Sequence, residues 1–446
     1  MVNNLSLPVD CKSYYFCRKL IWLYVLLLIF EGALRKWIFP SFATPLLIVR
    51  DPIVILLVIW GLHNRWLDFI YVKVMMIACT ISLFFSLLLG HHNLFVGLFG
   101  WRIYFFHFSL IFIIGQLLTR DDVLKICRFL LYLSIPMTAI ILLQFYSPPI
   151  SWINIGVGAE GTAGFSGANG FMRPSGVFSF TSGYVAYQGI VGCVLLYYLL
   201  MNKTLKEKVR ISNCILIIIL FCYLIAIPTS ISRTNLFQTI LFVVFFLFIA
   251  FVKRDARKAI LLCVCVGIII VMLMFSSSYF SDSIEAFSTR FANASKSEGG
   301  LEGTLGNRYL GGYLESLLKV DMPFWGFGIG LGTNAGANLM GGYFNSFGFN
   351  GEVEWERIIG ECGYIIGLII IGVRFFFALK LLFHSFDKLL KQADVLPWML
   401  AANMIISLPQ GQWVSTTSLG FCILTAGLTL ASIRTSAIDL KQSSDY

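Results

Sequence analysis

Long apolar segments alternate with short polar connections along most of this 446-residue chain. An α-helix needs roughly 20 mainly apolar residues to cross a hydrocarbon core of about 30 Å, because each residue adds about 1.5 Å. About twelve segments reach this length, so the pattern predicts an all-α integral membrane protein with one polytopic domain over residues 1–446. They fall near residues 20–39, 46–62, 70–90, 95–118, 126–147, 181–201, 211–229, 234–252, 259–276, 356–380, 395–410 and 413–433.

The composition supports this fold class. Hydrophobic residues make up 58% of the chain and charged residues only 13%, which excludes an ordinary soluble domain. The first apolar run is long and is not followed by a small-residue cleavage site, so we expect an anchor helix rather than a removed signal peptide.

The net charge of +10 does not predict a nucleic-acid partner, because the basic residues follow membrane topology. Short cytoplasmic connections carry an excess of Lys and Arg. Here the basic residues precede the first predicted span and then occupy every second connection, so we expect both termini in the cytoplasm. The main clusters are Lys12, Arg18 and Lys19; Arg120, Lys125 and Arg128; Lys203, Lys206, Lys208 and Arg210; and Lys253, Arg254, Arg257 and Lys258.

Two connections on the opposite side are long enough to fold over the membrane: residues 147–180, and residues 277–354 between the ninth and tenth predicted spans. The second is rich in glycine, including Gly326, Gly328 and Gly330 at alternate positions. A dinucleotide site would need a preceding parallel strand, and the sequence predicts none. We therefore interpret this stretch as re-entrant or surface-lying backbone that approaches a ligand closely, which glycine permits.

Arginines on the outer side oppose the charge bias, so each needs a reason. Arg233 lies in a very short connection, Arg173 precedes the sixth span, and Arg290 and Arg308 belong to the large outer loop. Guanidinium groups stay charged and grip phosphate oxygens with two parallel hydrogen bonds, which suits a lipid diphosphate. The alternative is that they anchor to lipid headgroups or pair with carboxylates.

Carboxylates gather where the tenth predicted span begins. Glu354, Arg357 and Glu361 are three and four residues apart and would share one helix face. One interpretation is a self-neutralising ladder of ion pairs. The other is that Glu352 or Glu354, held beside arginines, acts as general base toward a sugar hydroxyl.

Other charged residues suggest local pairing. Glu31, Arg35 and Lys36 are spaced for an internal ion pair, and Arg50 with Asp51 could satisfy each other. The histidines show no metal-ligand spacing, so neither a metal nor another cofactor is predicted.

Several short motifs resemble the bacterial O-antigen polymerase and O-antigen ligase superfamily of membrane glycosyltransferases. The resemblance covers most of the chain in layout, including the large loop before a late span. It rests on Arg173-Pro174-Ser175-Gly176-Val177-Phe178, Ser232-Arg233-Thr234, Gly306-Asn307-Arg308, Pro323-Phe324-Trp325-Gly326-Phe327-Gly328-Ile329-Gly330 and Glu361-Cys362-Gly363-Tyr364-Ile365-Ile366-Gly367.

This resemblance implies inverting, metal-independent glycosyl transfer on the outer face of the bacterial inner membrane, with a GT-C-like architecture. A sugar hydroxyl of one undecaprenyl-diphosphate-linked glycan would attack another and displace undecaprenyl diphosphate. On this basis Arg233 and Arg308 stabilise the leaving group, Arg173 helps position it, and Glu352 or Glu354 activates the hydroxyl.

Further candidate substrate-binding residues are Arg290, Arg357, Tyr313 and Trp325, the last by stacking on a sugar face. The expected partners are the lipid-linked glycan as donor and acceptor, and membrane lipids. A chain-length regulator protein is a candidate partner.

Ligases of this superfamily typically place a catalytic histidine nine residues before the glutamate that corresponds to Glu361. Glu352 stands there in this chain and is followed by Val353, which favours a polymerase. Two alternatives stay open: an O-antigen ligase that joins glycan to lipid A core, and a twelve-span secondary transporter. A transporter would commonly show two related halves, and this sequence shows no obvious internal repeat.

Overall fold

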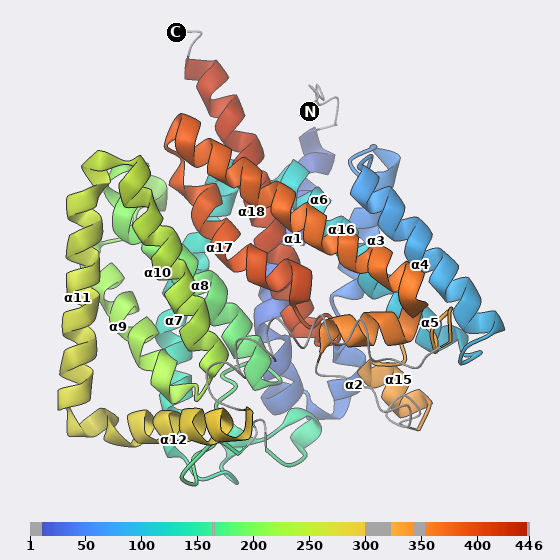
Figure 1. The fold of residues 1–446 in the computed structure, drawn as a ribbon, viewed down its shortest axis with the longest axis horizontal. Helices are drawn as coiled ribbons and strands as arrows, with labels where there is room; N and C mark the ends of the chain where they lie inside the picture. The colour runs from blue at the N-terminus through green and yellow to red at the C-terminus, as the bar shows by residue number, and fades with distance from the viewer. Residues whose placement is uncertain (1–10, 163, 165, 299–322, 342–352, 444–446) are drawn as a thin grey trace.

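The computed structural model describes residues 11–162, 164, 166–298, 323–341 and 353–443. Within these ranges the chain is helical and has no β-strand, which agrees with the predicted all-α class. Two isolated antiparallel bridges, Ile155 with Thr162 and Ser166 with Met172, join parts of the 147–180 segment. Figure 1 shows the helices gathered into one bundle.

The helices before the 147–180 segment are α1 (Cys11–Ala33), α2 (Ala43–Leu46), α3 (Asp51–His63), α4 (Ile70–Leu88), α5 (Leu94–Arg102), α6 (Phe108–Leu117) and α7 (Arg120–Tyr146). Those after it are α8 (Thr181–Met201), α9 (Asn213–Thr229), α10 (Arg233–Val252), α11 (Arg257–Ser276), α12 (Ser281–Glu298), α15 (Asn334–Leu339), α16 (Glu354–Gln392), α17 (Val395–Gln410) and α18 (Thr416–Ser443). The π-helical turns are η1 (Leu34–Ile38) and η3 (Ile103–His107), and the 3₁₀ turns are η2 (Pro40–Phe42), η4 (Trp152–Asn154), η5 (Val157–Ala159), η6 (Asn202–Thr204), η7 (Glu207–Val209), η8 (Arg254–Ala256) and η9 (Ser278–Phe280).

In the part of the chain that the structure describes, ten helices are long and apolar enough to cross a membrane. The chain is thus a multi-pass membrane protein by length and composition. Two of the twelve predicted spans are not among the ten. One corresponds to α1, and the other to α17, an apolar helix of 16 residues.

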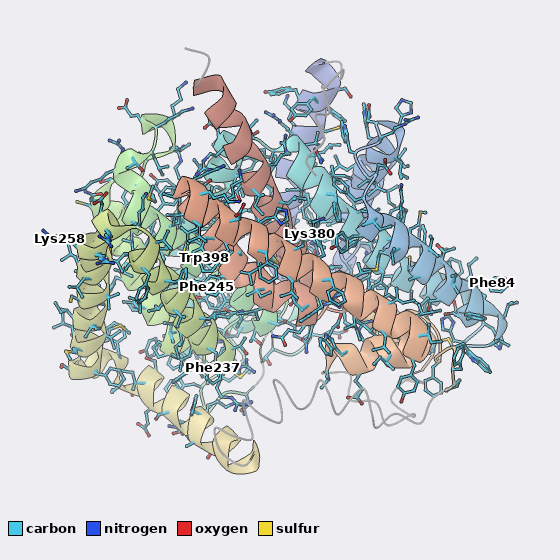
Figure 2. All side chains as sticks on the ribbon, turned by 45° about the horizontal axis from the view of Figure 1, so that its top comes forward. Phe84, Phe237, Phe245, Lys258, Lys380 and Trp398 are labelled. Carbon is cyan, nitrogen blue, oxygen red and sulfur yellow. The ribbon has the colours of Figure 1, made fainter. Side chains whose placement is uncertain are left out.

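The core is an apolar cluster in which α6, α8, α17 and α18 are the most enclosed helices. Stacked aromatic rings pack neighbouring helices against each other. Phe112 of α6 stacks on Phe377 of α16 at 4.8 Å between ring centroids. Phe245 of α10 stacks on Trp398 of α17 at 4.5 Å, and both side chains are labelled in Figure 2. In contrast, α11 lies at the edge of the bundle and exposes most of its surface.

The two ends of the bundle differ in character. Helix α1 begins and α18 finishes at one end, whereas α12 and the 147–180 segment lie at the other (Figure 1). Figure 2 shows Lys258 at the start of α11, far from α12, and Phe237 close to α12. The basic connection between α10 and α11 is therefore at the end opposite to α12.

Helix α16 is broken at Gly363, whose φ of 76° and ψ of 170° are not helical. A side chain there would bring its Cβ within 2.1 Å of the Phe324 carbonyl oxygen, so the break needs glycine. The segment before the break, residues 354–362, lies at an angle to the long remainder and at the α12 end of the bundle (Figure 1).

Candidate functional site

Three of the predicted arginines come together at the α12 end of the bundle. Arg173 lies in the 147–180 segment, Arg233 begins α10, and Arg290 lies on α12. They are close enough for the charges of Arg290 and Arg233 to lower the pKa of Arg173, in addition to the larger lowering that burial causes. We call Arg173, Arg233 and Arg290 the arginine cluster.

Helix α12 is amphipathic, and its apolar face seats it on the bundle. Ala286 is buried with Phe145 of α7 and Ile231 of the α9–α10 turn. Phe291 packs against Phe237 of α10 in a tilted arrangement, at 6.3 Å between ring centroids. Burial of these apolar side chains is what brings Arg290, one position before Phe291, to the other two arginines.

Two hydrogen bonds also hold α12 against the bundle. The Asn169 side chain donates to Glu285 Oε1 over 3.2 Å, and the Tyr146 hydroxyl donates to the carbonyl of Tyr279 over 3.0 Å. The first bond links the 147–180 segment to α12, and the second links the end of α7 to η9, just before α12. Together they fix α12 across the ends of α7, α9 and α10.

Arg233 is placed by a sharp turn. Ile231 has φ of 45°, and the Ser232 side chain accepts a hydrogen bond from the Asn235 N–H, which caps α10. Arg233 is thus the first residue of a 20-residue helix whose N-terminal dipole is positive toward the same side. The helix end and the guanidinium both favour a negative group there.

Two buried side chains, Gln144 and Lys36, hold the backbone that follows Arg173. We call these two side chains the frame. Gln144 Oε1 accepts from the N–H groups of Ser175 and Gly176, over 3.2 and 2.7 Å. Lys36 Nζ donates to Ser175 Oγ over 3.2 Å and to the Gly176 carbonyl over 2.7 Å. Lys36 and Gln144 are both buried, so these bonds are shielded from water.

The electrostatics of the arginine cluster favour an anion. Arg173 Nε is buried and has no hydrogen-bond partner in the described part of the chain. A phosphate or diphosphate beside these three guanidinium groups would lie in a region of positive potential and could accept paired hydrogen bonds. The geometry therefore fits the predicted role of Arg173, Arg233 and Arg290 in binding an anionic group.

The carboxylates at the start of α16 form a second cluster. Glu354 Oε1 accepts from Arg357 Nη2 over 2.9 Å and from Arg374 Nη1 over 2.8 Å. Glu361 pairs with Arg357 over 2.8 Å and accepts from the Gly332 N–H over 2.8 Å. All four side chains are buried.

This arrangement contains the ladder that the spacing predicts and adds Arg374 to it. With Glu354 buried between two arginines, its contacts fit the ladder interpretation better than contact with a sugar hydroxyl. Its role as general base stays a prediction. Arg357 lies inside the ladder, so its predicted contact with substrate also stays untested.

The glycine-rich stretch 323–333 packs against protein backbone. A Cβ at Gly326 would meet Gly363 N at 2.4 Å, and one at Gly330 would meet the Val96 carbonyl oxygen at 2.2 Å. The glycines therefore permit close approach to α16 and α5, where the sequence suggested close approach to a ligand. Trp325 is half-buried in this stretch.

His91 also packs against the stretch 323–333. Its Nδ1 accepts from the Asn93 N–H over 3.0 Å, so the neutral ring carries its proton on Nε2, which donates to the Ile329 carbonyl over 3.1 Å. The side chain is buried, and burial lowers its pKa.

Two ionic contacts near the start of the chain correct the sequence analysis. Arg50 pairs with Glu31 over 3.1 Å, and not with Asp51, because adjacent residues on a helix point in different directions. Asp51 instead contacts Arg102 and His107 of a neighbouring segment. The Glu31 to Arg35 pair is confirmed at 3.3 Å, whereas Lys36 belongs to the frame described above.

Three candidate residues, Glu352, Arg308 and Tyr313, lie outside the described residues. Three residues were not predicted for these clusters: Gln144, Lys36 as part of the frame, and Arg374. A polar residue at a predicted membrane depth was the available signal for each. Comparison of the chain with known protein families, with curated proteins and with solved structures finds no match.

Proposed function

We propose that this protein polymerises undecaprenyl-diphosphate-linked oligosaccharide units into O-antigen or a related surface polysaccharide. The observation that carries the proposal is the convergence of Arg173, Arg233 and Arg290 from three separate elements at one end of an apolar bundle. Such a cluster at the end of membrane-crossing helices suits an anionic group attached to a lipid.

The reaction needs no separate activation of the sugar, because the diphosphate is already a leaving group. An acceptor hydroxyl attacks the anomeric carbon, the bond from that carbon to the diphosphate oxygen breaks, and the configuration inverts. The arginine cluster and Arg308 stabilise the negative charge that develops on undecaprenyl diphosphate. Glu352 takes the hydroxyl proton, with Glu354 as the alternative base.

The proposed topology has twelve spans, α1 and α17 being added to the ten long apolar helices. The basic connections then face the cytoplasm with both termini, and the α12 end faces the periplasm of a bacterial inner membrane. A GT-C-like arrangement, in which the reaction takes place under a large external loop, accompanies this topology.

The test is polymerisation by the purified full-length protein supplied with its host's lipid-linked repeat unit, without nucleotide or divalent metal. We expect a ladder of lipid-linked oligomers and release of undecaprenyl diphosphate. Replacing Arg173 or Arg233 by alanine should slow the reaction by about 10²–10³, as loss of one charge-stabilising donor does. Lysine variants should retain more activity, because charge remains but the paired hydrogen bonds are lost.

Arg254→Ala is the matched control, since it removes an exposed arginine at the opposite end of α10. It should leave the rate unchanged. Absence of a ladder from folded protein and verified substrate would remove the polymerase proposal. Transfer to added lipid A core would then favour the ligase, and uptake of intact lipid-linked glycan into vesicles without oligomers would favour a transporter.

A further inference from the structure

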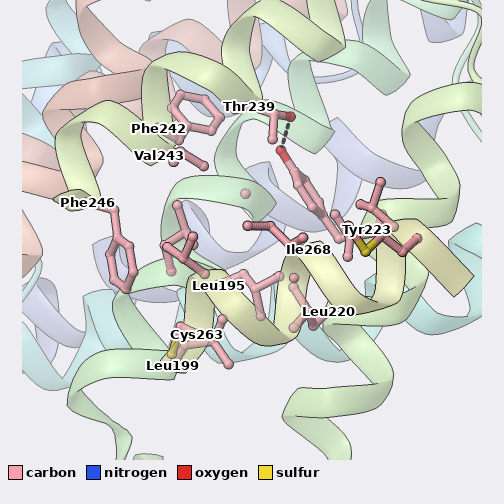
Figure 3. A pocket seen from close by; sticks show the side chains of 17 residues that line it. Leu195, Leu199, Leu220, Tyr223, Thr239, Phe242, Val243, Phe246, Cys263 and Ile268 are labelled. Atoms are coloured by element: carbon pink, nitrogen blue, oxygen red, sulfur yellow. Dashed lines mark hydrogen bonds between the residues drawn. The ribbon is translucent and has the colours of Figure 1, made fainter. Parts of the chain in front are cut away.

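An apolar pocket of about 420 Å³ lies between α8, α9, α10 and α11 (Figure 3). That volume is within the range of small-molecule sites in proteins, roughly 300–1,000 Å³. Leu195 comes from α8, Leu220 from α9, Phe242 and Phe246 from α10, and Ile268 from α11. Because Ile268 is half exposed, the pocket opens sideways at the edge of the bundle, beside α11.

The side chains that line the pocket favour a hydrocarbon ligand. Among the described lining residues the hydroxyl groups are those of Tyr223 and Thr239, and they bond to each other over 2.8 Å (Figure 3). Thr239 donates its own proton to the Asn235 carbonyl over 2.8 Å, so neither hydroxyl proton of the described lining is left for a polar ligand or for a water, which needs two or more polar partners. The pocket also lies among helices that are apolar enough to cross the membrane, where hydrocarbon chains are the surrounding solvent.

Helix α10 carries residues of both the pocket and the arginine cluster. Thr239 is six residues after Arg233 on α10, which corresponds to about 9 Å along the helix axis. Met272 of α11 also lines the pocket, and α11 ends at Ser276, shortly before α12 brings Arg290 to the cluster. A charged headgroup at the cluster would therefore have its chain beside the pocket.

We propose that this pocket receives the hydrocarbon chain of an isoprenoid diphosphate whose diphosphate lies on Arg173, Arg233 and Arg290. The inference rests on the proposed function, because it assigns the chain of the same substrate. Charge complementarity selects this occupant over a phospholipid. Three guanidinium groups match a diphosphate, which carries more negative charge than the single phosphodiester of a membrane phospholipid.

Gly267 offers a way to fill the pocket without disturbing the fold. It lines the pocket on α11, and a Cβ built there meets nothing within 4 Å. A larger residue also suits a helix interior better than glycine does. Gly372 of α16 is the matched control, because a Cβ there makes contacts of 3.8 Å or longer, with Phe376, away from the pocket.

The experiment uses full-length protein in vesicles with an undecaprenyl diphosphate analogue that carries a photoreactive group in its chain. Mapping the cross-linked peptides should place the chain on α10 and α11, around Phe242 and Ile268. Unlabelled undecaprenyl diphosphate should compete, and phosphatidylglycerol at the same concentration should not. Gly267→Phe, or Gly267→Leu if the former folds poorly, should lower the yield about tenfold or more, equivalent to 1.4 kcal/mol. Gly372→Phe should not.

Cross-links elsewhere, an undiminished yield in both Gly267 variants, or equal competition by phosphatidylglycerol would each overturn the assignment. The outcome is separable from the proposed function. Polymerisation by the wild-type protein tests that function without reference to the pocket. Cross-linking detects a lipid chain in the pocket whether or not a glycan is transferred. In the polymerisation assay, Gly267→Phe should raise KM and leave kcat near its wild-type value.

Discussion

Arg374 Nη1 donates to Glu354 Oε1 over 2.8 Å, although a break in α16 separates the two residues. The same guanidinium donates to the carbonyls of Leu408 and Gly411, over 2.9 and 2.8 Å. One buried side chain thus joins both parts of α16 to the turn between α17 and α18. The contact makes Glu354 part of an ion-pair ladder that holds the α12 end of the bundle together.

Breaking this contact should destabilise the protein. Arg374→Met and Glu354→Gln each leave charge without its partner in a buried site, and removing one member of a buried ion pair costs about 3–5 kcal/mol. Thermal or denaturant unfolding of the detergent-solubilised protein would measure the loss. Glu207→Gln, at an exposed carboxylate, should leave stability unchanged.

Comparison of Glu354→Gln with Glu352→Gln separates the two candidate bases. We expect Glu354→Gln to lose stability, with activity falling in proportion to the folded fraction. Glu352→Gln should keep its melting temperature and lose polymerisation. A stable but inactive Glu354→Gln protein would instead assign the base to Glu354.

Gly363 and Gly372 should respond oppositely to alanine although both lie in α16. Gly363→Ala forces a side chain onto a positive φ and against the Phe324 carbonyl, so it should lower stability and loosen residues 323–333. Gly372→Ala should be neutral or stabilise by about 0.5–1 kcal/mol, because alanine favours the helix. Unfolding curves of both variants would test this. Equal effects would argue against the break.

Acid should weaken the contact between His91 and residues 323–333. Burial lowers the pKa of His91, Glu361 opposes that shift, and His92 adds to it. As pH falls below 6.5, the ordinary value, the unfolded chain binds a proton that the folded ring resists. The stability that neutral His91 contributes is thus present above this pH and is lost as pH falls further.

Melting temperatures between pH 7.5 and 5.5 would measure this dependence. In His91→Gln the amide can still donate to Ile329 but cannot titrate, so the loss of stability on acidification should be smaller. If wild type and variant lost stability in parallel, another group would be responsible.

The frame around Ser175 and Gly176 should control how well Arg173 is positioned. Lys36→Met removes one of the two side-chain donors to the Gly176 carbonyl, the other being Gln144 Nε2, so amide exchange over residues 173–178 should rise. The affinity for a lipid-linked diphosphate should fall by about tenfold, or 1.4 kcal/mol. Gln144→Leu leaves two buried N–H groups unpaired, and each costs about 1–3 kcal/mol. Lys19→Met, at an exposed lysine, is the control, and unchanged exchange in Lys36→Met would contradict this role.

The candidate site was predictable only in part. Arg173 and Arg233 stand out in the sequence because arginine is unusual on the outer side, and the ladder of Glu354, Arg357 and Glu361 follows from helical spacing. The pairing of Arg50 with Asp51 was predicted from adjacency and is wrong. Sequence separation carries no information about contacts that depend on how distant helices pack.

Hydrophobicity and helix rise set how long an apolar segment must be, so a helical membrane protein with polar loops at one end can be predicted from the amino acids without coordinates. Three contacts are visible only in the folded bundle: Arg290 joins Arg173 and Arg233, Arg374 reaches Glu354, and Lys36 holds Gly176. Each contact joins residues too far apart in the chain for helical spacing to predict it. Each depends on the packing of apolar faces and on the need of buried polar groups for partners, and both are properties of the assembled bundle.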